Sequence, residues 1–384
     1  MFNSLDAVLD NALSTGQIIG AVSAVFRNGE KIYSGKAGFA HKAKNIPISD
    51  DSVFRLFSLT KPVTAVASMI AMDMGLICPD DPVSKFFPEF SQLSYVNENN
   101  EIVPCDVQIK LSHLLNMTSG IPYPDNWGVS VCAMGRLFDE IIEGQDCGKE
   151  LTTEEICRKT ASVPLLYKPG EQWSYGFSAD IMGGIIEKAS GMKYSDFLKK
   201  YIFVPLGMND TDFYVPADKL HRFTALYGWN SNGLEENHDR HLGLTDYLKP
   251  PAFESGGAGL VSTINDYSKF ACMLANKGVF NGIRIISENA FAYLSTPKLD
   301  DTQRSYLWER LVGYNYGCFM RIMESPEISL NRTFKGEMGW DGWTGTFFAV
   351  DPVNNIAFLY FTQICGGGTT PQAEEMCRIV YKNI

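Results

Sequence analysis

The chain has 384 residues, 45% of them hydrophobic and 20% charged, which is enough to bury one large core or two ordinary ones. This composition excludes a mainly disordered or low-complexity protein. The formal net charge of −11 repels phosphate backbones and anionic lipid surfaces. We therefore expect no nucleic acid partner.

Nine cysteines are scattered along the chain without a C-x-x-C pair, which favours reduced, mostly buried thiols over a zinc or redox site. The N-terminal residues lack the basic and apolar regions of a secretory signal, so we expect a cytoplasmic location. The longest apolar stretch, 63–77, is too short to span a bilayer and contains Asp73. We expect no membrane span, no cofactor and no metal, and the oligomeric state stays open.

The two ends of the chain show related patterns. Residues 4–14 carry apolar side chains at helical spacing and predict an opening helix. Two strand-like runs, 21–27 and 31–37, flank Asn28-Gly29, a dipeptide that tolerates the positive φ of a tight hairpin turn. Toward the other end, the patterns predict a second antiparallel pair and then a closing helix, at 346–351, 356–363 and 371–384.

The middle of the chain predicts helices joined by loops rich in Gly, Pro and Asn, with helical patterns at 62–74, 180–189 and 264–276. The simplest architecture is α+β, in which both ends build one antiparallel sheet flanked by helices and the middle forms a mainly helical second lobe. We expect a single domain over 1–384. Its α/β lobe would cover about 1–62 and 250–384, and its helical lobe about 63–249. A small-molecule site usually occupies the cleft between two such lobes.

The tetrapeptide S-x-x-K, known from β-lactamases and penicillin-binding proteins, occurs three times. Ser190 precedes Gly191 at a predicted helix end, and Ser295 begins a Ser-Thr-Pro turn, so two copies have structural explanations. Ser58 instead precedes Lys61-Pro62 and a long apolar helix, which places it at a helix N-terminus. A residue three positions further on lies on the same helix face, so Lys61 can reach the Ser58 hydroxyl.

Two interpretations of Ser58 are open on this tetrapeptide alone. A serine hydroxyl becomes a good nucleophile when a neighbour takes its proton, and a desolvated lysine with a lowered pKa can do this. The alternative is a helix cap beside an ordinary surface lysine. The sequence contains no G-x-S-x-G, H-E-x-x-H or glycine-rich phosphate-binding pattern, which removes several other enzyme classes.

Five ordered segments favour the nucleophile. They resemble the class C β-lactamase-like serine hydrolases, a family that includes β-lactamases, D-amino-acid peptidases, esterases and transesterases. The resemblance runs from about residue 20 to the C-terminus and is far more specific than one tetrapeptide. It implies a β-lactamase/transpeptidase-like fold. The segments are FSLTK at 57–61, LLNMTSG at 114–120, PGEQWSYGFSAD at 169–180 with IIEKASG at 185–191, SGGAGLVST at 255–263 and GWDGWTGTFF at 339–348.

The resemblance also implies roles for individual residues. Ser58 would be the acylated nucleophile, Lys61 its hydrogen-bonded partner, and Tyr175 the phenol or phenolate that shuttles the proton. A tyrosine beside a lysine ammonium has a stabilised anion, which agrees with a general base. The implied oxyanion hole uses the backbone N–H groups of Ser58 and Trp343. Gly342 would let the strand lie close to the substrate.

Departures from the β-lactamase pattern bear on the substrate. β-Lactamases of the family have Asn two residues after the tyrosine and Lys-Thr-Gly in the third motif, where this chain has Phe177 and Trp340-Asp341-Gly342. An ionised Asp341 in the cleft would repel the carboxylate of a β-lactam. A surface position for Asp341 and a pairing with a substrate amine are the alternatives.

The altered motifs are similar to the esterase branch, which favours an ester or activated acyl donor. Trp173, Phe177, Trp340 and Trp343 then either form the wall of an apolar acyl pocket or fill the core.

The five histidines adjoin no nucleophile motif. His113 fits a core or helix-cap position, and the polar loop with His238 and His241 is expected to border the cleft.

We expect a serine hydrolase that forms an acyl-enzyme on Ser58 and acts as an esterase or acyl transferase on a small ester. The alternatives are a D-amino-acid peptidase or amidase, a weak β-lactamase, and a non-catalytic descendant that binds a ligand.

Overall fold

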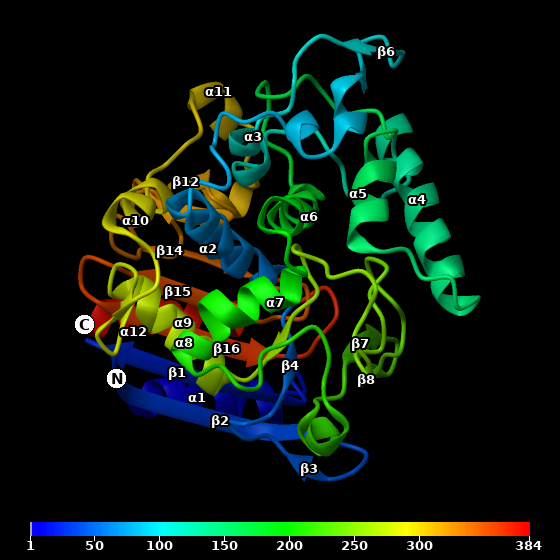
Figure 1. Ribbon diagram of the computed structural model, residues 1–384. Helices are drawn as coiled ribbons and strands as arrows, with labels where there is room; N and C mark the ends of the chain where they lie inside the picture. Colours follow the sequence, from blue (N-terminus) through cyan, green and yellow to red (C-terminus); the bar gives the residue numbers. More distant parts are fainter. Residues whose placement is uncertain (1) are drawn as a thin grey trace.

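The computed structural model describes residues 2–384. An eight-stranded antiparallel sheet forms its centre, and both ends of the chain contribute strands to it (Figure 1). Strand β1 of the N-terminal hairpin pairs with β16 near the C-terminus, where Ala21 lies opposite Thr362. The predicted α+β architecture is therefore confirmed. In spatial order the strands are β12 (Tyr314–Gly317), β13 (Met320–Met323), β14 (Met338–Asp341), β15 (Phe347–Asp351), β16 (Ile356–Thr362), β1 (Gly20–Arg27), β2 (Glu30–His41) and β3 (Ile46–Pro47).

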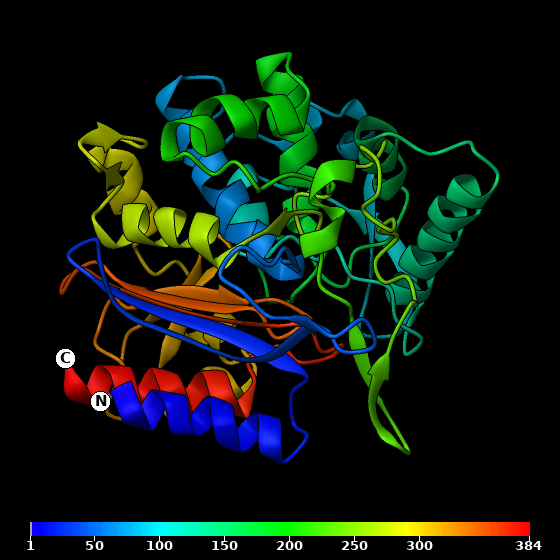
Figure 2. The same cartoon turned by 90° about the horizontal axis from the view of Figure 1, so that it is seen from below.

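Helices cover both faces of the sheet, which explains why every residue of β15 and β16 is buried. On one face, α1 (Phe2–Ser14) and α12 (Pro371–Asn383) lie side by side (Figure 2). Their apolar sides, including Leu5 and Met376, share a hydrophobic cluster with the sheet. On the other face, α9 (Ile264–Ala275) packs against β15 and β16. The predicted opening and closing helices are confirmed.

Most of the remaining helices lie on the α9 side of the sheet (Figures 1 and 2). Helix α2 (Thr60–Asp73) is buried along almost its whole length and packs against α6 and α10. The others are α3 (Leu111–Leu115), α4 (Val129–Asp146), α5 (Thr153–Thr160), α6 (Ser178–Ser190), α7 (Tyr194–Leu198), α8 (Val204–Leu206), α10 (Glu288–Leu294) and α11 (Asp301–Arg304). Among residues 2–384, no helix has both the length and the apolar character needed to cross a membrane.

Four short antiparallel pairs lie outside the main sheet in the described part of the chain. One of them, β4 with β9, stands directly before the turn that carries Ser58 and pairs Phe54 with Ser262. The pairs are β4 (Phe54–Arg55) with β9 (Val261–Ser262), β5 (Leu93–Val96) with β6 (Ile102–Cys105), β7 (Tyr227–Asn230) with β8 (Gly233–Glu236), and β10 (Val279–Phe280) with β11 (Ile283–Arg284).

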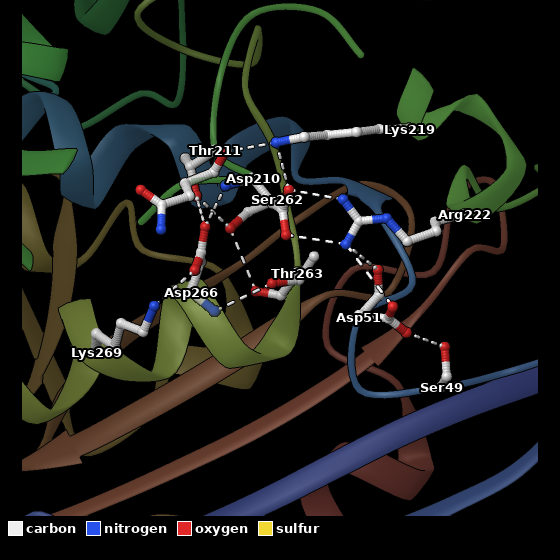
Figure 3. Close-up of polar contacts among 11 residues, drawn as sticks. Ser49, Asp51, Asp210, Thr211, Lys219, Arg222, Ser262, Thr263, Asp266 and Lys269 are labelled. Carbon is white, nitrogen blue, oxygen red and sulfur yellow. Dashed lines mark hydrogen bonds and ion pairs between the residues drawn. The ribbon is translucent and has the colours of Figure 1, made fainter. Parts of the chain in front are cut away.

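A polar network ties three segments together around the β4–β9 pair (Figure 3). Arg222 donates to both carboxylate oxygens of Asp210 at 2.7 and 2.9 Å, and Lys219 lies 2.6 Å from the same carboxylate. The backbone N–H of Asp210 donates to Asp266, an acid in the first turn of α9, at 2.6 Å. Arg222 also donates to the backbone oxygen of Asp51 at 3.3 Å. The network therefore links the loop before β4, the 210–222 segment and α9.

We expect replacement of Arg222 by methionine to lower the free energy of unfolding by about 1–2 kcal/mol at neutral pH, with solvent screening taken into account. Hydrogen bonds from Arg222 are the main reason that the pKa of Asp210 falls from 3.8 to about 2. A depressed carboxyl pKa stabilises the fold above the unfolded value, and this contribution is lost as the pH falls from 3.8 toward 2.

Urea unfolding of wild type and variant between neutral pH and about pH 3 measures this difference. The difference should shrink below about pH 4. Arg284→Met, which removes an exposed pair with Glu288, is the control and should change stability by less than about 0.5 kcal/mol. A difference that stays constant with pH would contradict the assigned role of Asp210.

Candidate active site

Ser58 lies where the chain turns from β4 into α2. A 3₁₀ turn, Phe57–Leu59, connects the two elements, and Ser58 within it is 8% exposed. Phe57 has a φ of 46°, in the left-handed region that residues with a side chain rarely adopt. The first N–H groups of a helix have no acceptor within it and favour negative charge. The structure thus places the serine at a helix start, as the sequence predicts.

Lys61 is fully buried and points its amine at Ser58. The Nζ atom donates to Ser58 Oγ at 3.1 Å, to the hydroxyl of Tyr123 at 2.9 Å and to the carbonyl oxygen of Gly257 at 2.9 Å. Burial lowers the pKa of Lys61 from 10.5 to about 7, against the opposing charges of Asp180 and Asp341. Near neutral pH a large share of Lys61 is therefore the free amine, which can accept a proton from Ser58.

Tyr175 also lies against the lysine amine, with its ring centre 4.6 Å from Lys61 Nζ. Its hydroxyl accepts a hydrogen bond from the indole Nε1 of Trp340 at 3.0 Å. Burial raises the pKa of Tyr175, while hydrogen bonds with Ser58 and Trp340 oppose the rise. Of the two forms predicted for Tyr175, burial therefore favours the phenol over the phenolate.

Tyr123 was not predicted from the sequence. It lies in the loop between α3 and α4, and its hydroxyl accepts from Lys61. Its ring centre lies 5.7 Å from that of Tyr175, so two phenols face the same amine. Helical and strand periodicity carry no signal for a loop residue. The one sequence signal that could have indicated Tyr123 as a site residue was its position three residues after the LLNMTSG segment at 114–120.

Gly342 allows β14 to end against the Ser58 turn. A Cβ atom at this position would lie 2.2 Å from the carbonyl oxygen of Leu56, so any larger residue would push the strand away. The next residue, Trp343, packs its ring 5.0 Å from that of Phe57. Among residues 2–384, no backbone carbonyl accepts a hydrogen bond from the backbone N–H of Trp343. This arrangement suits the predicted pair of oxyanion donors, Ser58 and Trp343, which stays a prediction.

The loop around residue 241 reaches the site through Trp343. His241 stacks on that indole with ring centres 4.0 Å apart and planes 18° apart. Burial lowers the pKa of His241 from 6.5 to about 4, so the ring is neutral at neutral pH. His238 is exposed. His113 accepts the backbone N–H of Lys110 at the start of α3, which confirms its predicted cap position.

Three of the predicted pocket residues are packed behind the site. Trp173, Phe177 and Trp340 are 3%, 1% and 2% exposed, which matches the core interpretation rather than the pocket wall. Trp308, which was not predicted, is 37% exposed, and its ring centre lies 5.1 Å from that of Tyr175. Trp343 is partly exposed. The two tryptophans that reach the surface beside the site are therefore Trp308 and Trp343.

Asp341 is 9% exposed, so the interpretation as a surface carboxylate is wrong. Its Oδ2 accepts the hydroxyl of Thr369 and lies 3.5 Å from a guanidinium nitrogen of Arg310. Arg310 in turn stacks on Trp308. Because the arginine offsets the carboxylate charge, Asp341 repels an approaching anion less than the sequence alone suggested.

The other two S-x-x-K copies have the structural roles expected of them. Ser190 ends α6 before Gly191, whose φ is 66°, and Ser295 is the C-cap of α10.

The chain is similar to several known proteins. Residues 5–375 match the family model described as Beta-lactamase. The esterase EstB of Burkholderia gladioli is 28% identical over 93% of this chain and 89% of its own length. The acyltransferase calJ of Penicillium decumbens is 26% identical over 87% of this chain and 81% of its own. The solved structure of EstCE1, a hydrolase with promiscuous acyltransferase activity, superposes with a TM-score of 0.81 at 22% identity, covers 98% of this chain and 96% of that one, and supports the fold.

Proposed function

The chain belongs to the β-lactamase family and is a serine hydrolase or acyl transferase of that superfamily, and from this premise we propose that it forms an acyl-enzyme on Ser58 with a small ester. The acyl group then passes to water or to an alcohol. The observation that carries the proposal is the buried Lys61 amine 3.1 Å from the Ser58 hydroxyl. A pKa of about 7 lets that amine act as a base near neutral pH.

The proposed reaction has two halves. Ser58 Oγ attacks the ester carbonyl carbon while its proton moves to Lys61, and the carbonyl oxygen becomes an oxyanion held by the Ser58 and Trp343 N–H groups. Collapse of this intermediate breaks the bond to the alcohol oxygen, which takes a proton from the Tyr175 phenol, and Lys61 reprotonates the tyrosine. Water or a second alcohol then attacks the acyl-enzyme, gives up its proton by the reverse route and releases Ser58.

Ester chemistry is favoured over β-lactam chemistry by the third motif. The lysine that would receive a β-lactam carboxylate is replaced by Trp340-Asp341-Gly342, and the nearby cation Arg310 is already paired with Asp341. The relatives named above as an esterase and an acyltransferase support the same choice. A cytoplasmic location is part of the proposal, supported by nine cysteines that form no disulfide within residues 2–384.

Intact-mass labelling with a fluorophosphonate tests the proposal. We expect one covalent adduct on the wild type, none on Ser58→Ala, and a full adduct on Ser190→Ala, which alters a structural S-x-x-K copy. Failure to label the wild type, or labelling of Ser58→Ala, would count against it.

Substrate panels distinguish the subclasses. Turnover of p-nitrophenyl butyrate should exceed that of D-alanyl p-nitroanilide and of a chromogenic cephalosporin. A preference for the amide would instead indicate a D-amino-acid peptidase.

A further inference from the structure

We propose that Asp180 is a positioning residue for Lys61, acting through the backbone turn at 255–258, an inference that rests on the proposed role of Lys61 as the base. Asp180 lies in the first turn of α6 and is 1% exposed. The reaction scheme above does not use it. Two hydrogen bonds nevertheless connect it to the lysine amine, and both are made by the backbone of Gly257.

The carboxylate of Asp180 holds the turn in place. Its Oδ1 accepts the hydroxyl of Ser255 and the backbone N–H of Gly257, the latter at 3.1 Å. The Ser255 hydroxyl oxygen also accepts the backbone N–H of Ala258 at 2.9 Å. One carboxylate oxygen thus organises four consecutive residues. Hydrogen bonds to an ionised acceptor are stronger than neutral ones, so removing the charge should loosen the turn.

Gly257 connects the turn to Lys61 because its backbone binds both Asp180 and the lysine amine. While its N–H binds Asp180, its carbonyl oxygen accepts Lys61 Nζ at 2.9 Å. Within residues 2–384, the amine donates three hydrogen bonds, to this carbonyl, to Tyr123 and to Ser58. The direction in which Nζ points therefore depends on where the turn places one backbone oxygen, and Asp180 controls that position.

Gly257 is required here for space. A Cβ atom on this residue would lie 2.3 Å from Oδ2 of Asp180 and 3.1 Å from the hydroxyl of Tyr123. The carboxylate and the phenol that binds Lys61 therefore press against the same side of the glycine. A larger residue would displace one of the groups that surround the amine.

The second carboxylate oxygen of Asp180 indicates that Asp180 also acts on Lys61 through its charge. Asp180 Oδ2 is buried and has no hydrogen-bond partner within residues 2–384. A buried carboxylate oxygen without a donor is costly unless a nearby cation compensates it. Burial raises the pKa of Asp180, and the charge of protonated Lys61 opposes this rise, so the Lys61 ammonium is that cation. In return, Asp180 stabilises the ammonium that forms when Lys61 takes the proton of Ser58.

Other groups around the pair do not compete for this proton near neutral pH. Burial raises the pKa of each neighbouring phenol and thiol, namely Tyr123, Tyr175, Tyr194 and Cys157. Asp341 is the second carboxylate that acts on Lys61, and a change at Asp180 leaves it in place. A shift in the pH profile of kcat/KM on replacing Asp180 therefore reports on the interaction between Asp180 and Lys61.

The test is Asp180→Asn, which keeps the shape and the acceptor oxygen but removes the charge. The acid limb of kcat/KM for p-nitrophenyl butyrate should move to lower pH by about 1 unit, because Lys61 loses a stabilising anion. The plateau of kcat/KM should fall about 10- to 100-fold. Glu187→Gln is the matched control, since Glu187 lies on the same helix but binds the backbone of Tyr194, and both quantities should stay at wild-type values.

Ser255→Ala provides a second variant that leaves both charges in place, and it also serves if Asp180→Asn does not fold. It should lower the plateau of kcat/KM about 10-fold by loosening the turn, with a much smaller shift of the acid limb. An unchanged profile in Asp180→Asn, or unchanged activity in Ser255→Ala, overturns the inference. Fluorophosphonate labelling of wild-type Ser58 distinguishes failure of this inference from failure of the proposed function. If wild-type Ser58 is not labelled, the proposed function itself is rejected.

Discussion

Replacement of Lys61 by methionine is expected to lower kcat/KM for ester hydrolysis about 10³- to 10⁴-fold. Methionine fills a similar apolar volume but cannot accept the proton of Ser58. The amine lies 3.1 Å from that hydroxyl and is fully buried, so no water replaces it without rearrangement. In the wild type, kcat/KM should rise with pH through about 7, as Lys61 loses its proton.

Steady-state kinetics on p-nitrophenyl butyrate, together with thermal unfolding, measures this prediction. Lys298→Met is the matched control, because Lys298 belongs to a structural S-x-x-K copy and stacks on Tyr293 instead of contacting a serine. It should keep wild-type kcat/KM. Activity of Lys61→Met within about 10-fold of wild type would rule out the lysine as the base.

Replacement of Tyr175 by phenylalanine should lower kcat/KM about 10²- to 10³-fold with little change in stability. The ring and its contacts with Trp308 and Trp340 remain, while the hydroxyl that exchanges hydrogen bonds with Ser58 and Trp340 is lost. The leaving alcohol then lacks its proton donor. Esters with good leaving groups need less protonation, so the loss should be larger for ethyl butyrate than for p-nitrophenyl butyrate.

Tyr316→Phe is the control for this variant. Tyr316 is fully buried and packs on Trp340, but its hydroxyl has no hydrogen-bond partner within the described chain. Its removal should leave kcat/KM unchanged. Tyr123→Phe discriminates further, because Tyr123 also contacts Lys61. Should Tyr123→Phe show the leaving-group dependence and Tyr175→Phe lack it, the donor would be Tyr123.

Local patterns were sufficient for the elements at the two chain ends. The strand-like runs 21–27 and 31–37 and the Asn28-Gly29 dipeptide predicted the hairpin, and both turn residues have positive φ, 54° and 78°. The long helix α4 was not predicted. The addition of strands β12, β13 and β14 to the edge of the sheet was not predicted either. The pairing of these strands depends on contacts between segments that short-range periodicity does not describe.

The sequence by itself determined the family, the α+β fold and the serine–lysine pair, because Ser58 and Lys61 are neighbours on one helical turn and their spacing is local. The tertiary structure alone decided which groups surround the amine. Tyr123, Gly257 and Asp180 come from three other segments, and burial among them lowers the pKa of Lys61. Burial and charge pairing arise only when distant segments pack, which is why the environment of Asp341 was misjudged and that of Asp180 was not foreseen.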